Sequence, residues 1–158
     1  MRRAAVSIMA LGTMASAVIA MSGAPAQASS HAHASSRIVI REIYYNSPGS
    51  DHGSNSSLNH EWVELHNRTG QRIALTHWTL RDKQGHVYRF GTYRLKAHGY
   101  VKIHTGKGRD TRADLHWRHS WYIWNNTGDR ATLKNAGGSV IARCSYSDPH
   151  EEHSFKVC

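Results

Sequence analysis

The sequence lacks the motifs of the common catalytic and filament-forming classes. It has no Gly-x-Ser-x-Gly elbow, no His-Glu-x-x-His pair and no glycine-rich phosphate loop. It also has no heptads and no internal repeat, which argues against a coiled coil or a repeat architecture. After the N-terminal region, no window shows the apolar spacing of an amphipathic helix. These absences favour a non-helical domain without a recognisable catalytic site.

Long hydrophobic runs are missing as well. Arg2 and Arg3 precede a modestly apolar stretch at 4–20, which is shorter than the roughly 20 residues of a membrane-spanning helix. Ala26-Gln27-Ala28 then matches a small-x-small cleavage site. The pattern predicts a bacterial Sec-type signal peptide at 1–28, cut after Ala28, and a secreted, extracellular product with no membrane anchor. Twin-arginine export is the alternative, because the two arginines are adjacent.

The rest of the chain is predicted to form one domain. Residues 29–36 have neither periodicity nor a large apolar side chain, which indicates a flexible linker. The remaining length is enough for a single hydrophobic core. We expect the domain at 37–147, a C-terminal tail at 148–158, and a monomer.

Cysteine is scarce, and its position is informative. Cys144 and Cys158 are the only two, both near the C-terminus. A structural zinc site needs more ligands at closer spacing, whereas an exported chain favours a disulfide. A bridge of this loop size would stabilise the fold by about 3 kcal/mol in the chain-entropy model. We therefore expect the bridge to pin the tail to the last strand, with intermolecular pairing as the alternative.

Short alternating segments separated by turn residues dominate the domain. Val63 and Leu65 alternate with more polar neighbours, the period-2 pattern of a half-buried strand. Residues at 67–70 and 82–85 are of the types that hairpin turns require. This predicts an all-β fold, a β-sandwich of about seven to eight short strands. The strands are expected at 38–45, 61–66, 73–80, 87–90, 100–104, 121–124, 130–134 and 140–146, with a long loop at 46–59.

Two of these segments change their alternation part of the way along. The apolar positions shift phase at Arg41-Glu42, and again between Leu75 and Trp78. A one-residue shift moves side chains to the other face of a sheet unless an extra residue is accommodated. The pattern predicts a bulge or bend at each place.

Six segments resemble successive strands and turns of the lamin tail domain family. They lie, in order, at 40–48, 61–67, 75–80, 88–90, 98–106 and 124–133. The resemblance covers nearly the whole chain after the predicted leader. It implies an immunoglobulin-like β-sandwich that serves as a binding or scaffold module, with no catalytic motif to transfer. Because the chain has no coiled-coil rod, the filament assembly of nuclear lamins is not implied.

Basic charge is concentrated in one part of the chain. The formal net charge is +9, and the stretch from 81 to 118 holds ten basic and three acidic residues. Cations beside aromatic rings are typical of proteins that bind single-stranded nucleic acid. Charge alone does not specify a ligand, so the favoured interpretation is a solvated loop. The hypothesis beside it is a loop that binds polyanions weakly, either nucleic acid or an anionic cell-wall polymer. Its candidate residues are Lys107, Arg109, Arg112, Trp117, Arg118 and Trp121.

The histidines and acidic residues do not form a recognisable metal site. Thirteen histidines are present, but each close pair lacks a third and a fourth ligand. Asp51 and Asn55 carry oxygen ligands suited to Ca²⁺, without EF-hand spacing. We therefore expect no metal and no cofactor. The histidine pairs are His31 with His33, His116 with His119, and His150 with His153.

No acid/base pair is recognisable either. Glu61 and Glu64 are three residues apart on a predicted strand, so their side chains point to opposite faces. We expect a non-enzymatic domain, with a metal-dependent hydrolase or nuclease of unrecognised site as the alternative. A carbohydrate-binding module is a second alternative if strand aromatics form an exposed row. We expect these aromatics to pack in the core instead: Tyr44, Tyr45, Trp62, Trp78, Tyr88, Phe90, Trp124 and Tyr146.

Overall fold

The computed structural model describes residues 37–49 and 51–158. The predicted signal peptide, its cleavage site at Ala28, the linker and the pair His31 and His33 lie outside the described residues. The elements, in chain order, are β1 (Ile38–Tyr44), α1 (Asn55–His60), β2 (Trp62–Asn67), β3 (Ile73–Ala74), β4 (Thr79–Arg81), β5 (Val87–Arg89), β6 (Arg94–Leu95), β7 (Tyr100–His104), β8 (Asp114–His116), β9 (Gly128–Lys134), β10 (Val140–Ser147) and β11 (Phe155–Val157).

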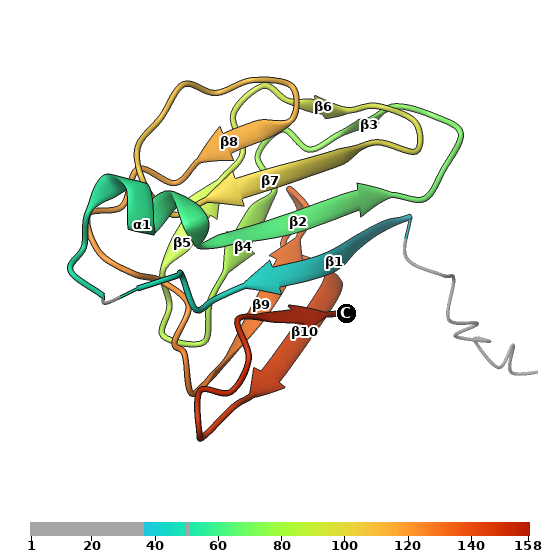
Figure 1. Cartoon of the computed structure of the whole chain (residues 1–158). Helices are drawn as coiled ribbons and strands as arrows, with labels where there is room; N and C mark the ends of the chain where they lie inside the picture. The colour runs from blue at the N-terminus through green and yellow to red at the C-terminus, as the bar shows by residue number, and fades with distance from the viewer. Residues whose placement is uncertain (1–36, 50) are drawn as a thin grey trace, which may run out of the picture. The chain divides into compact units, whose positions relative to one another are not determined.

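The strands form two facing sheets and one small additional sheet (Figure 1). The first sheet has the order β11-β1-β2-β7-β8 and the second has the order β10-β9-β4-β5. β3 and β6 pair with each other beside them. The pairs are antiparallel except for β7 with β8, which run parallel. This arrangement confirms the predicted β-sandwich.

Alternation along the strands places the core between the two sheets. On β2, Val63 and Leu65 are fully buried, while Glu64 between them faces outward. On β9, Ala131 and Leu133 face inward in the same way. The core contains Tyr45, Phe90 and Trp124, as predicted. Tyr44 and Trp62 are different: they lie half-buried on the outer face of the first sheet.

The predicted bulge at 41–42 is present. The register between β1 and β2 shifts between Ile40 and Glu42. The extra residue lets both Ile40 and Ile43 reach the interior, although they are an odd number of positions apart. The change of alternation in the sequence at 41–42 therefore marks the bulge in β1.

The prediction of a single strand at 73–80 is wrong, because this segment divides between two sheets. β3 pairs with β6, and β4 pairs with β5 and β9. Between them the chain turns at His77, whose φ is +64°. The second phase change thus marks a turn that moves the chain from one sheet to another.

Two further expectations are corrected. The segment 46–59 was predicted as a loop, yet it contains most of α1, whose Ser54 cap accepts a hydrogen bond from the backbone N–H of Ser57. Leu58 is the one buried residue of this six-residue helix, so the sequence has no apolar periodicity that would predict the helix. The strand predicted at 121–124 is absent, because the N–H groups of Ile123 and Trp124 bind a side chain instead of a neighbouring strand.

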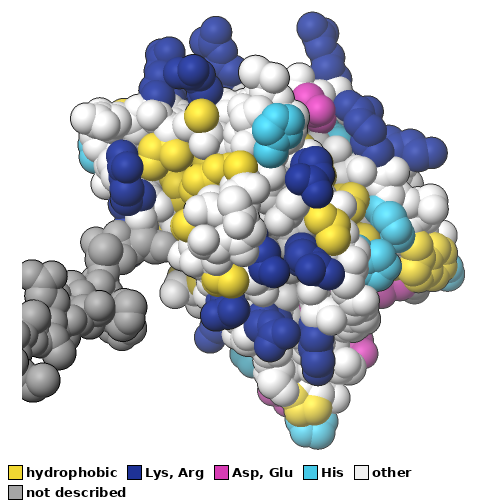
Figure 2. Space-filling view, turned by 180° about the vertical axis from the view of Figure 1, so that it is seen from behind, with side chains coloured by type: hydrophobic (Ala, Val, Ile, Leu, Met, Phe, Trp, Pro, Cys, Tyr) yellow, Lys and Arg dark blue, Asp and Glu magenta, His cyan; other side chains and the backbone are white. Residues whose placement is uncertain are grey.

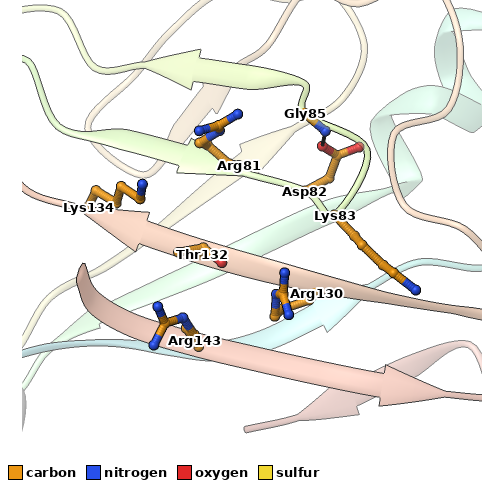
Figure 3. A pocket seen from close by; sticks show the side chains of 8 residues that line it. All are labelled: Arg81, Asp82, Lys83, Gly85, Arg130, Thr132, Lys134 and Arg143. Atoms are coloured by element: carbon orange, nitrogen blue, oxygen red, sulfur yellow. Dashed lines mark hydrogen bonds between the residues drawn. The ribbon is translucent and has the colours of Figure 1, made fainter. Parts of the chain in front are cut away.

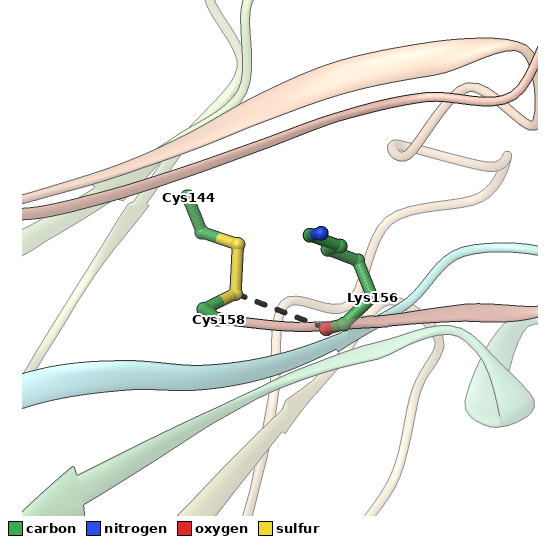
Figure 4. The surroundings of a disulfide bond; sticks show 3 residues. All are labelled: Cys144, Lys156 and Cys158. Carbon is green, nitrogen blue, oxygen red and sulfur yellow. Dashed lines mark hydrogen bonds between the residues drawn. A yellow bond between two sulfur atoms is a disulfide. The ribbon is translucent and has the colours of Figure 1, made fainter.

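The C-terminal tail closes one side of the sandwich. β11 pairs with β1, placing Phe155 opposite Tyr44. A disulfide joins Cys158 to Cys144 on β10, with the two Cα atoms 5.8 Å apart (Figure 4). The bridge therefore connects an edge strand of the first sheet to an edge strand of the second.

Asp148 fixes the turn that leads into this tail. Its carboxylate accepts hydrogen bonds from the hydroxyl of Tyr45, 3.0 Å away, and from the backbone N–H groups of Glu152 and His153. Burial opposes the charged form, but these donors lower the pKa of Asp148 below its usual value. Among the residues described, no helix is long and apolar enough to cross a membrane.

Candidate polyanion-binding surface

Five basic side chains surround a shallow hollow on the outer face of the second sheet (Figure 3). The hollow has a volume of about 510 Å³. Seen from behind, Lys and Arg side chains gather over this side of the molecule (Figure 2). We call this surface the cation face. Its basic residues are Arg81, Lys83, Arg130, Lys134 and Arg143.

Strand alternation and register bring these residues together from three segments. On β9, Arg130, Thr132 and Lys134 face outward because the residues between them are buried. Thr132 pairs with Arg81 on β4 and with Arg143 on β10, so the three form one row across the sheet. At normal strand spacing, the Cα atoms of the two arginines lie about 10 Å apart.

The five cations have no anionic partners within the part of the chain that the structure describes. Its ion pairs involve Arg41, Arg118 and several histidines, but none of these five side chains. Unpaired like charges on one surface create a positive potential that attracts anions. The positive charge of the cation face is therefore not neutralised by ion pairs among the described residues.

Asp82 lies at the rim of the hollow without pairing any of the five cations. It is only 6% exposed. Its Oδ1 accepts hydrogen bonds from the backbone N–H groups of Gly85 and His86, each at 2.7 Å, and Oδ2 contacts the ring of His86. These partners hold the turn between β4 and β5, so the carboxylate has a structural role.

On the outer face of the first sheet, charged side chains have partners within the domain. Arg41 contacts Glu64 at 2.9 Å and Glu42 at 3.1 Å. The hydrogen bond and charge of Glu64 raise the pKa of Arg41. Lys102 lies with its Nζ 3.6 Å from the centre of the Trp62 ring, in a cation–π contact.

Aromatic rings on the same face stack on each other. Tyr44 stacks between Trp62 and Phe155, with ring centres 5.6 Å and 6.1 Å away. The interplanar angles are 25° and 13°, so neighbouring rings lie nearly parallel. Lys102 covers part of the Trp62 surface. Tyr44 and Trp62 are half-buried in this row, whereas Phe155 is 50% exposed.

The loop predicted to bind polyanions divides into separate environments. Trp117 is half-buried against the core, with Tyr88 at 5.7 Å and Trp124 at 6.1 Å between ring centres. Arg118 pairs with Asp110 at 3.4 Å. Three other predicted cations are exposed: Lys107, Arg109 and Arg112.

Trp121 is the exposed ring of that loop, with 56% of its surface accessible. The hollow beside it is lined by Asp51 and Glu151 and, among the described residues, by no lysine or arginine. The structure therefore does not combine Trp121 with the loop cations in this hollow.

The residues considered for metals have other partners. Asn55 accepts a hydrogen bond from the backbone N–H of Lys107 and donates one to its carbonyl. Asp51 accepts a hydrogen bond from Asn126. His116 contacts Asp110 at 3.1 Å. Within residues 37–49 and 51–158, no three His, Cys, Asp or Glu side chains gather in a manner suited to a metal ion.

Glu61 is an interior residue whose role the sequence did not reveal. It is fully buried, and its two carboxylate oxygens accept hydrogen bonds from the N–H groups of Ile123 and Trp124 at 3.0 Å and 2.9 Å. Burial raises the pKa of Glu61 to about 8, although these hydrogen bonds favour the charged form. Glu64 points outward to Arg41, so the two carboxylates do not converge.

The two packed sheets of short, mostly antiparallel strands define an immunoglobulin-like β-sandwich. The family model described as Lamin Tail Domain matches residues 31–148. The chain belongs to the lamin tail domain family, as its sequence segments indicated. This family consists of immunoglobulin-like domains that are generally non-catalytic. A search of curated proteins finds no match.

Proposed function

We propose that the protein is a secreted, non-enzymatic binding domain that holds polyanions on the cation face. The observation that carries this proposal is the set of five unpaired basic side chains around one hollow. Phosphate groups are suitable ligands, because arginine binds them in a bidentate manner and lysine binds them as a point charge. The partner is nucleic acid or an anionic cell-wall polymer.

The composition of the hollow favours recognition of a phosphate backbone. None of its described lining residues is aromatic, whereas proteins that bind single strands stack bases on aromatic rings. A duplex, or a polymer without bases, should therefore bind as well as single-stranded DNA. If four cations contact phosphates of a duplex, the logarithm of affinity should fall with log salt at a slope of about −3.6.

Charge reversal on the cation face tests this proposal. We suggest the triple variant Arg130→Glu, Lys134→Glu and Arg143→Glu, with binding to a labelled DNA duplex and to inorganic polyphosphate measured by fluorescence anisotropy. The matched control reverses three cations of the predicted loop: Lys107→Glu, Arg109→Glu and Arg112→Glu. Both variants change the net charge equally, so a difference between them locates the site.

We expect the cation-face triple to weaken binding at least about 10-fold and to reduce the salt slope by about 3. The loop triple should lose clearly less. Equal losses of affinity in the two variants would indicate a general effect of net charge. A larger loss of affinity in the loop triple would place the binding site in the loop at 107–121 instead. Cleavage of DNA in the presence of a divalent metal would contradict the non-enzymatic part of the proposal.

A further inference from the structure

A second hollow, with a volume of about 330 Å³, lies beside Trp121. Its size is at the lower end of the range for small-molecule clefts, roughly 300–1,000 Å³. It differs from the cation face in chemistry, because its lining combines aromatic rings with carboxylates, amides and hydroxyls. The lining residues are Asp51, Trp121, Tyr122, Trp124, Asn125, Asn126, Thr127 and Glu151.

The indole ring of Trp121 is exposed but held in place. A Cβ atom added to Gly53 would lie 2.6 Å from the ring, so the ring packs directly on the backbone of this glycine. Gly53 has a φ of +68°, which also favours glycine at this position. Tyr122 contacts the ring edge-on, and its hydroxyl shares a hydrogen bond with Ser57. The remaining surface of Trp121 is therefore presented to solvent in a fixed orientation.

Polar groups surround this ring. Asn126 donates a hydrogen bond to Oδ2 of Asp51 at 3.3 Å, which positions both side chains at the hollow. The carboxylate of Glu151 is exposed. Trp124 also lines the hollow.

We infer that this hollow is a saccharide-binding subsite for a neutral sugar or an amino sugar. A sugar ring has a face of C–H groups, which packs on an aromatic ring, and a rim of hydroxyl groups, which bond to amides and carboxylates. The two carboxylates at the hollow disfavour uronic acids and phosphates and are compatible with an ammonium group. The inference does not depend on polyanion binding, because no residue of the cation face lines this hollow.

The test uses the protein without its predicted signal peptide, residues 29–158, titrated with defined trisaccharides by isothermal calorimetry. The probes are the trimers of N-acetylglucosamine, glucosamine and glucose, with trigalacturonate as the anionic comparison. The variants are Trp121→Ala and Asn126→Ala. Phe155→Ala is the matched control, because Phe155 is 50% exposed but belongs to β11. Thermal unfolding checks that each variant is folded.

We expect saturable binding of at least one neutral or amino trimer and none of trigalacturonate. Trp121→Ala should weaken binding at least about 10-fold, because it removes the aromatic ring on which the sugar packs. Asn126→Ala should weaken binding about 3-fold, because it removes a single hydrogen-bonding group. Phe155→Ala should change affinity less than about 2-fold. No saturable binding of any neutral or amino trimer, unchanged affinity in folded Trp121→Ala and Asn126→Ala, or equal binding of trigalacturonate would each overturn the inference.

Discussion

Strand alternation places charged side chains on both outer faces of the sandwich, but these side chains interact differently on the two faces. On the first sheet, Arg41 is paired with two glutamates, Lys102 lies on an aromatic ring, and the rings stack on one another. On the second sheet, five cations face a hollow without partners among the described residues. The charged groups of the first face interact inside the domain, whereas the five cations of the second face have no anionic partner among the described residues.

Charge density along the sequence does not show which cations are neighbours in the fold. The basic stretch at 81–118 suggested a loop, but Arg118 there is paired and Trp117 packs on the core. The cation face takes residues from β4, β9, β10 and one turn. Strand register, which sequence composition does not report, is what makes them neighbours.

Breaking the disulfide tests how far the first face depends on the tail. In the double variant Cys144→Ser and Cys158→Ser, β11 loses its covalent anchor, and Phe155 is no longer held against Tyr44. We expect the free energy of unfolding to fall by about 3 kcal/mol, as the chain-entropy model gives for a loop of this size. Urea denaturation of the oxidised protein and the variant measures the change. Equal midpoints would show that β11 is held by its other contacts alone.

Changing the pH separates the interior from the paired surface. Because the pKa of Glu61 in the folded protein, about 8, is above its ordinary value of 4.5, the folded state holds this proton more tightly than the unfolded state. The contribution of Glu61 to the free energy of unfolding should therefore be fully present below pH 4.5 and decrease as pH rises toward 8. We expect a decrease of about 3–4 kcal/mol between pH 5 and 8.

The variant Glu61→Gln should lack this pH dependence, at the cost of leaving one of the two backbone N–H groups unsatisfied. Glu64→Gln is the matched control, because it removes a carboxylate that pairs with Arg41 on the outer face. Surface ion pairs contribute about 0–1 kcal/mol. The control should therefore retain the decrease, and chemical denaturation across the pH range measures both variants. A decrease lost in Glu64→Gln and kept in Glu61→Gln would contradict this account.

A pair of single substitutions compares the two faces directly. Trp62→Ala removes a ring stack and a cation–π contact, and we expect it to lower the free energy of unfolding by about 1–2 kcal/mol. Arg143→Ala removes an exposed cation that has no anionic partner among the described residues, so stability should change by less than about 0.5 kcal/mol. Polyanion affinity should show the reverse order. Similar stability losses for both variants would mean that the faces are not distinct.

Much of the fold could be read from the sequence because strand alternation is a local signal. The bulge at 41–42 and the strands around Val63 and Ile103 follow directly from apolar period-2 patterns. β6 and β8 were missed, since two or three residues are too few to establish a period. α1 was missed because it buries one side chain.

The candidate sites were harder to predict, for a physical reason. Arg130, Thr132 and Lys134 alternate with buried residues, a pattern that indicates an outward-facing polar row on one strand. Their proximity to Arg81 and Arg143 depends on pairings between distant segments. Glu61 gave no local signal at all, because its partners are more than 60 residues further along the chain.

The edges of the sandwich affect how the molecule behaves in a crowded solution. β5, β8 and β11 each end a sheet, and each has three residues. These three edges leave few consecutive backbone amides to template a strand from another chain. β10 is the long edge strand within the described residues, with eight residues, and its register irregularity near Val140 affects only its first residues. This edge is therefore where we expect another extended chain to pair most readily.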